Sequence, residues 1–156
     1  MAVLSADSTA VSRHRGECRR AKLVNGVADE TYYKGAIVYY LAAGKITPVN
    51  AAGLVPAGIV AEASDGAIGT SATVDVWIAG EFLIAYATPA QTDEGQMVYT
   101  DVSAASDNPA ELLPAGHGSL STGNDIAFGR VIEFVSSTAG SWVRLNDKSA
   151  VTLTAP

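Results

Sequence analysis

The stretch Gly35-Ala36-Ile37-Val38-Tyr39 decides the fold, because a related stretch, Gly95-Gln96-Met97-Val98-Tyr99, follows sixty positions later. Self-similarity at a fixed offset is typical of a chain built from repeated structural units. In each copy a run that contains β-branched and aromatic residues follows a glycine, which favours a β-strand. The repeated stretch therefore predicts two related strand units.

Further segments repeat in the same order after each copy. Residues Gly58 to Glu62 follow the first copy, and Gly129 to Glu133 follow the second at an offset of 71. The alternating stretches Thr73 to Ile78 and Ser141 to Leu145 then complete the two units. Loops tolerate insertion better than strands do, so the changed offset indicates retained strands joined by loops of different length. Three ordered echoes predict repeats at about 31–82 and 95–145, although a β-rich chain also produces a short G-x-x-V-Y motif by chance.

Alternation and turn residues place the remaining elements. The predicted strands are Ala21–Val24, Thr31–Tyr33, Ile37–Leu41, Ile46–Val49, Gly58–Glu62, Thr73–Ala79, Gly80–Tyr86, Met97–Tyr99, Ala127–Val135 and Ser141–Leu145. Asn25-Gly26 is typical of a tight hairpin turn. No segment has long helical periodicity. The predicted fold class is all-β: a small β-barrel or sandwich built from two related strand repeats, with an extended N-terminal arm.

Charge is unevenly distributed along the 156 residues, whose net charge is −6. Residues 1–22 hold five basic and two acidic side chains, a net charge of +3, and residues 23–156 hold five basic and fourteen acidic ones, a net charge of −9. The five basic residues are Arg13, Arg15, Arg19, Arg20 and Lys22. With few large apolar side chains, this segment cannot offset the entropy cost of ordering itself. We expect residues 1–22 to be an arm that is disordered alone or ordered by another surface, followed by a β domain at 23–150 and a tail at 151–156.

The sequence carries no catalytic, cofactor or metal motif. The single cysteine, Cys18, cannot form an internal disulfide, and with two histidines it makes no familiar zinc spacing. His117 and Ser119 place a base near a hydroxyl, but no third group is identifiable that would orient them. The phosphate-binding glycine motifs are missing, and Glu62 and Glu133 end strands as solvated carboxylates. We expect no enzymatic activity, no cofactor and no metal.

Membrane and nucleic-acid roles are also disfavoured. The longest uncharged run, residues 46–61, is broken by prolines and glycines and is shorter than the roughly 20 apolar residues of a spanning helix. The N-terminus lacks the pattern of a secretory signal, so we expect synthesis in a cytoplasm. A basic arm attracts phosphates, but a body of net charge −9 repels them, and no aromatic residue is interleaved with the arginines. An acidic protein partner suits the arm better, and a solvated tail without function is the alternative.

Trp77 is the remaining candidate contact residue. Val74, Val76 and Ile78 form one apolar face of a predicted strand, which leaves Asp75 and Trp77 on the other. Trp77 then either contacts a partner or is covered by a second sheet or loop. Hydrophobic residues make up 48% of the chain and charged residues 17%, which favours a protein that works in an assembly.

The repeated unit combines Lys34-Gly35-x-x-Val38-Tyr39, a Gly-Lys turn, Gly58 to Glu62 and the alternating stretch Val74 to Gly80. In this combination it resembles the small capsid decoration, or cement, proteins of tailed bacteriophages, well over 31–82 and loosely over 95–145. The resemblance implies a β-rich structural protein of the virion that sits on the outer surface of the phage head, binds the major capsid protein as a homotrimer and stabilises the shell. It also implies that residues 1–22 are an arm reaching onto the shell or a neighbour. The basic character of the arm and the long loop 101–125 depart from the family pattern.

A second interpretation is a β-barrel glycan- or protein-binding module of a surface or tail protein. Trp77, Tyr39, Tyr40 and Trp142 would form its aromatic platform.

Overall fold

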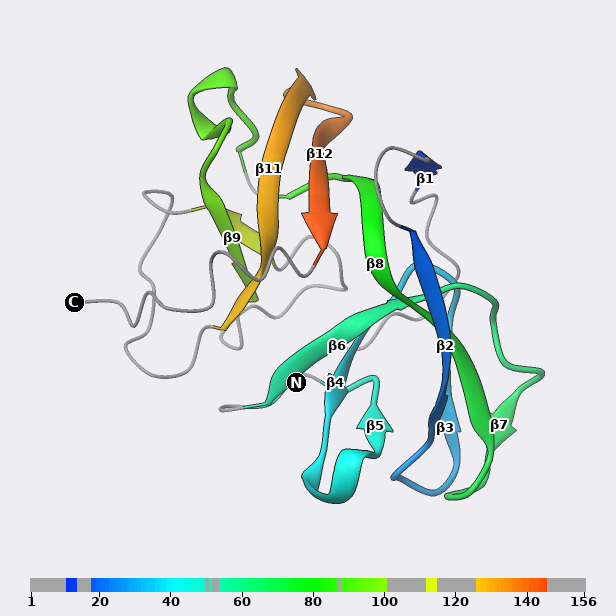
Figure 1. Ribbon diagram of the computed structural model, residues 1–156. Coiled ribbons are helices and arrows are strands. Elements are labelled where there is room, and N and C mark those ends of the chain that lie inside the picture. The colour runs from blue at the N-terminus through cyan, green and yellow to red at the C-terminus, as the bar shows by residue number, and fades with distance from the viewer. Residues whose placement is uncertain are drawn as a thin grey trace.

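In the computed structural model, strands are the main type of secondary structure (Figure 1). It describes residues 11–13, 18–49, 51, 54–86, 88–100, 112–114 and 126–145, and for 11–13 and 112–114 it describes the backbone alone. The strands are β1 Val11–Arg13, β2 Arg19–Val24, β3 Glu30–Thr31, β4 Ile37–Tyr40, β5 Ile46–Thr47, β6 Val55–Val60, β7 Ala67–Ile68, β8 Thr73–Ile84, β9 Met97–Thr100, β10 Leu112–Pro114, β11 Ala127–Ser136 and β12 Gly140–Leu145. Short 3-10 turns lie at η1 Ala42–Gly44 and η2 Gln91–Asp93. The predicted all-β fold is confirmed.

The sheet is organised around β8. Its strand order is β10-β9-β11-β12-β8-β6-β4-β5, and every neighbouring pair is antiparallel. The first half of β8 pairs with β2 on one edge and β6 on the other, and the second half pairs with β1 and β12. The sheet is strongly curled, so the strands of the two repeats lie on either side of a common interior (Figure 1).

β8 continues through a glycine that the sequence analysis took for a boundary. The prediction of two strands, Thr73–Ala79 and Gly80–Tyr86, is wrong, because β8 is one strand from Thr73 to Ile84. Gly80 has a φ of 138°, a conformation that side-chain-bearing residues rarely adopt. A glycine inside a strand often marks a bend, and here it lets the two halves of β8 serve different parts of the core.

The two repeats have the same backbone hydrogen bonds. The N–H of Gly35 donates to the C=O of Val60 at 2.9 Å, and the N–H of Gly95 donates to the C=O of Val131 at 2.8 Å. Both glycines have positive φ, 85° and 82°. The predicted offsets of 60 and 71 therefore relate residues that occupy equivalent positions in the two repeats.

Strand register repeats as well. Val38 lies opposite Gly58, and Val98 lies opposite Gly129. In both pairs the register shifts by one residue just beside the glycine, which indicates a β-bulge at the same place. Both valines are fully buried, as the repeat assignment predicts.

The interior consists of two hydrophobic clusters. The first, here called the inter-repeat core, joins both repeats and contains Ile37, Tyr39, Ile59, Phe82, Ile84, Tyr86, Val98, Phe128, Val131, Val143 and Leu145. The second, the first-repeat core, contains Tyr32, Ala36, Val38, Ile46, Ala57, Val60, Val74 and Val76. The first-repeat strands β4 and β6 are thus covered on both faces, which explains their continuous apolar runs.

The boundary predicted between arm and domain needs correction. Strand β2 begins at Arg19, and Val11–Arg13 also pairs with β8, so part of the segment 1–22 belongs to the sheet. The edge strand β2 is rich in basic residues, a composition that disfavours unwanted pairing between sheet edges. Residues 1–10, 14–17 and 146–156 lie outside the described residues.

The predicted hairpin at Asn25-Gly26 is also wrong. Strand β2 pairs with β8, while β3 pairs with β7 in a separate two-stranded sheet. Asn25 is fully buried, and its side-chain amide donates to the C=O of Gly69 at 3.0 Å while its Oδ1 accepts the hydroxyl of Tyr32 at 2.7 Å. Asn25 therefore anchors the chain between β2 and β3 instead of turning it back on itself.

Candidate functional site

Five side chains on β2, β8 and the connection after β6 form one solvent-accessible cluster, here called the β2 surface. Its members are Arg20, Lys22, Glu62, Asp75 and Trp77. The antiparallel register places Arg20 opposite Trp77 and Lys22 opposite Asp75. Side chains directly opposite in an antiparallel pair lie on the same face of the sheet and interact. Backbone pairing thus positions four of the five side chains.

Arg20 makes the most contacts in the β2 surface. Its guanidinium carbon lies 4.7 Å from the centroid of the Trp77 ring, which is a cation–π contact. Its Nη2 also lies 3.0 Å from Oε1 of Glu62. The side chains of Arg20 and Glu62 are 39% and 68% exposed, so solvent reaches this ion pair freely. Arg20 therefore joins β2 to both β8 and the residue after β6.

Trp77 lies at the boundary between core and solvent. It is half-buried, packs against the inter-repeat core, and its ring centroid is 6.1 Å from that of Phe82 at an interplanar angle of 58°. Across the sheet Trp77 lies between buried Ile59 on β6 and exposed Arg20 on β2. The indole is thus supported by the core and covered on one face by Arg20.

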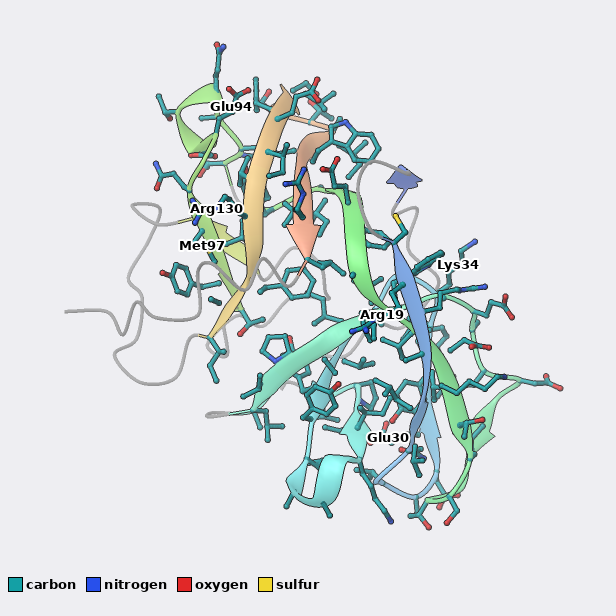
Figure 2. The ribbon with its side chains drawn as sticks, in the orientation of Figure 1. Arg19, Glu30, Lys34, Glu94, Met97 and Arg130 are labelled. Atoms are coloured by element: carbon teal, nitrogen blue, oxygen red, sulfur yellow. The ribbon has the colours of Figure 1, made fainter. Side chains whose placement is uncertain are left out.

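The other two basic residues of β2 differ in their surroundings. Lys22 Nζ lies 3.4 Å from Oδ2 of Asp75, with the lysine side chain 71% exposed. Arg19, labelled in Figure 2, is exposed and forms no ion pair with any residue that the structure describes. It directly precedes Arg20 in the strand, so its side chain leaves the sheet on the opposite face. The β2 surface therefore carries two cations and two carboxylates, which pair with each other.

The sequence analysis grouped five basic residues as one contact set, and the structure brings two of them, Arg20 and Lys22, together on one face of β2. Arg13 lies on β1 opposite Glu81, although only its backbone is described, and Arg15 lies outside the described residues. The expectation that the basic arm leaves its charges available to another surface is corrected for Arg20 and Lys22. Both already pair with acids of the same chain.

A shallow depression of about 110 Å³ adjoins the β2 surface. It is lined by Glu62, Ala63, Ser64, Thr73, Val74 and Asp75. Typical small-molecule sites measure roughly 300–1,000 Å³, so this depression is far smaller. Within the described ranges there is no group of three or more potential metal ligands, and no helix there is long and apolar enough to cross a bilayer. His117 and Ser119 lie outside the described residues.

Two buried polar groups escaped the sequence analysis. Glu81 on β8 is 1% exposed and accepts a hydrogen bond from Nε of Arg144 on β12 at 3.0 Å. Tyr86 donates its hydroxyl proton to Oδ2 of buried Asp93 at 3.0 Å and shares a 2.9 Å hydrogen bond with Oγ of Ser141. Burial raises the pKa of Tyr86 to about 12. Both groups join segments that are distant in the sequence, since Glu81 lies opposite Arg144 in the β8–β12 register and Tyr86 contacts Ser141 on β12.

The aromatic platform of the second interpretation is not assembled. Tyr39 is fully buried in the inter-repeat core, while its neighbour Tyr40 is 37% exposed. Trp142 lies on β12 opposite Leu83 in the second half of β8, away from the first half that holds Trp77. These side chains therefore do not form one continuous surface on which a sugar could stack.

Comparison with known proteins adds no family assignment. No protein family model matches the chain, and no curated protein sequence matches it.

Proposed function

We propose that the protein is a capsid decoration protein that binds the outer surface of a phage head and stabilises the shell. The resemblance of its repeated strand unit to phage cement proteins supports the proposal. The observation that carries it is the β2 surface, where an exposed arginine and lysine lie on β2 beside a half-buried tryptophan of the paired strand β8. Tryptophan and arginine are the residue types most enriched at the energetic centres of protein interfaces.

The rigidity of the β2 surface suits such a role. Trp77 is supported by the inter-repeat core, and β2 is fixed by its pairing with β8. A preformed surface loses little conformational entropy on binding, so even a modest contact is effective. When many copies bind a symmetric shell, each weak contact is repeated, and the assembly is stabilised far more than one copy would achieve.

The partner in this proposal is the major capsid protein, and the location is the outer face of the virion. A homotrimer would present three β2 surfaces around a three-fold position of the shell. Sedimentation equilibrium over a range of concentrations measures this directly, with a mass three times that of one chain as the expected result. A monomer at all concentrations would contradict the trimer.

Attachment to heads tests the main proposal. Purified protein is mixed with expanded, DNA-free heads of the phage that encodes it, and bound protein is measured after co-sedimentation. Arg20→Glu should weaken attachment about five- to tenfold, because an exposed charge contact is lost and a repulsion replaces it. Lys45→Glu, which makes the same charge change next to η1, is the matched control and should bind as wild type does. Failure of wild-type protein to sediment with heads, together with binding to a bacterial glycan, would favour the glycan-binding module instead.

A further inference from the structure

We infer that the β2 surface is a carboxylate-binding site that Glu62 and Asp75 occupy from within the chain until an acidic protein segment replaces them. The inference deepens the proposed function, since it names the chemistry of the partner and the regulation of the same surface. It rests on that proposal only for the partner's identity.

The geometry at Arg20 is that of a carboxylate-recognition site. The guanidinium is oriented by its stack over Trp77, and Nη2 contacts one carboxylate oxygen of Glu62 at 3.0 Å. A planar guanidinium recognises a carboxylate best through two parallel hydrogen bonds. The contact with Glu62 is through a single oxygen, so a partner carboxylate that approaches freely would bind with better geometry.

Glu62 is the more easily replaced of the two internal acids. Its side chain is 68% exposed, whereas that of Asp75 is 29% exposed and its Oδ2 lies 3.4 Å from Nζ of Lys22. Exposed ion pairs change an equilibrium constant by at most about fivefold each. Glu62 and Asp75 therefore lower the affinity for an outside carboxylate without preventing its binding.

An acidic protein segment fits this surface better than a nucleic acid. Arg20 covers Trp77, so the ring face is not open for a base to stack on it. The chain's net charge of −6 also opposes a polyphosphate, whose charge is dense and continuous, more than a short acidic peptide.

The test compares two double variants of equal charge. Glu62→Gln with Asp75→Asn removes the internal carboxylates, whereas Asp29→Asn with Asp65→Asn removes two exposed acids that lie outside the β2 surface. Asn is well tolerated at position 29, where φ is 60°. The probe is a fluorescently labelled hexaglutamate peptide, measured by anisotropy at low salt. Thermal unfolding of each variant verifies that it is folded.

The Glu62/Asp75 variant should bind hexaglutamate about three- to twentyfold more tightly than the Asp29/Asp65 variant. Adding Arg20→Gln to both variants should remove most of this difference. Equal affinity of the two double variants, or a difference that persists without Arg20, would overturn the inference. So would a larger gain for a labelled hexathymidylate than for the peptide.

The peptide measurement does not depend on capsids. If the Glu62/Asp75 variant binds hexaglutamate more tightly but wild-type protein does not bind heads, the carboxylate site is supported and the decoration function is refuted. If heads bind and the peptide gain is missing, the decoration function stands and the carboxylate competition falls.

Discussion

Gly129→Ala should be among the most destabilising small substitutions in the protein. A Cβ at position 129 would lie 2.4 Å from the backbone oxygen of Arg144 and 3.0 Å from a methyl of Val143. Real Cβ atoms do not approach a carbonyl oxygen so closely, and this oxygen belongs to a paired strand that cannot move alone. Overpacking a rigid interior costs typically 1–3 kcal/mol. We place Gly129→Ala at the upper end, about 3 kcal/mol, since backbone must shift.

The matched control is Gly66→Ala. Gly66 has a φ of 74° and no atom within 4 Å of the added Cβ, so its substitution incurs only the left-handed backbone strain of roughly 1–2 kcal/mol. Urea denaturation followed by circular dichroism gives both free energies of unfolding, and 3 kcal/mol corresponds to a fall of about 6–12 °C in Tm for a chain of this size. Gly58→Ala, at the equivalent bulge, should behave like Gly129→Ala, because its Cβ would lie 2.1 Å from the backbone oxygen of Trp77. If Gly129→Ala proved no worse than Gly66→Ala, the close strand approach at the bulge would be refuted.

Three further predictions follow from the fold. Val38→Ala and Val98→Ala should each lower the free energy of unfolding by about 2 kcal/mol, because both valines are fully buried, and a neutral result at either would remove that position from the core. Burial raises the pKa of Tyr86 to about 12, against about 10 in the unfolded chain, so the wild-type protein should lose stability as pH rises from 10 to 12. Tyr86→Phe should make this alkaline decline shallower, and an unchanged slope between pH 9.5 and 11.5 would count against it. Trypsin should spare Arg20 and Lys22 in brief digestion of the native protein, because both lie in a paired strand, and early cleavage at either would contradict that pairing.

The sequence predicted the repeats well because they depend on local features. A glycine before a β-branched run determines both the turn and the strand, and Gly35 and Gly95 are found with nearly equal φ values. Strand pairing was harder to predict. Asn25-Gly26 has the composition of a hairpin turn, yet β2 pairs with β8 because that edge of the sheet is available and offers Asp75 and Trp77 opposite its basic residues. Such pairing joins residues about fifty positions apart, which local patterns do not report.

The candidate site, like the fold, was predictable only where it depends on local sequence features. Trp77 and the basic residues were identified as contact candidates from composition and alternation. No local pattern indicates that Glu62 contacts Arg20, because the two lie on segments that only β8 brings together. The charge imbalance between residues 1–22 and the remainder was real, but part of it is cancelled inside the chain.

The repeats pack through unlike faces. Val60 and Val131 are equivalent by register, yet Val60 lies in the first-repeat core and Val131 in the inter-repeat core. The opposite face of the first repeat, represented by Ile59, enters the inter-repeat core. The face of the second repeat that contains Val131 therefore packs against the first repeat. The equivalent face of the first repeat, which contains Val60, is directed away from the second repeat. In such an arrangement, one face of each repeat lies outside the contact between the two repeats.

On the face of the second repeat that lies outside this contact, arginines stand where the first repeat has apolar residues. By register, Ile59 and Trp77 of the first repeat correspond to Arg130 and Arg144 of the second, and Figure 2 shows Arg130 on β11. The Arg144 side chain is 45% exposed and pairs with Glu81, so its charge is already matched at the surface. Terminal units of stacked repeats need a polar outer face to remain soluble. A further apolar unit packed there would have to desolvate the ion pair between Arg144 and Glu81, which costs several kcal/mol unless every hydrogen bond is replaced. The outer face of the second repeat is therefore poorly suited to pack against a further apolar unit, because the residues at the contact positions are charged.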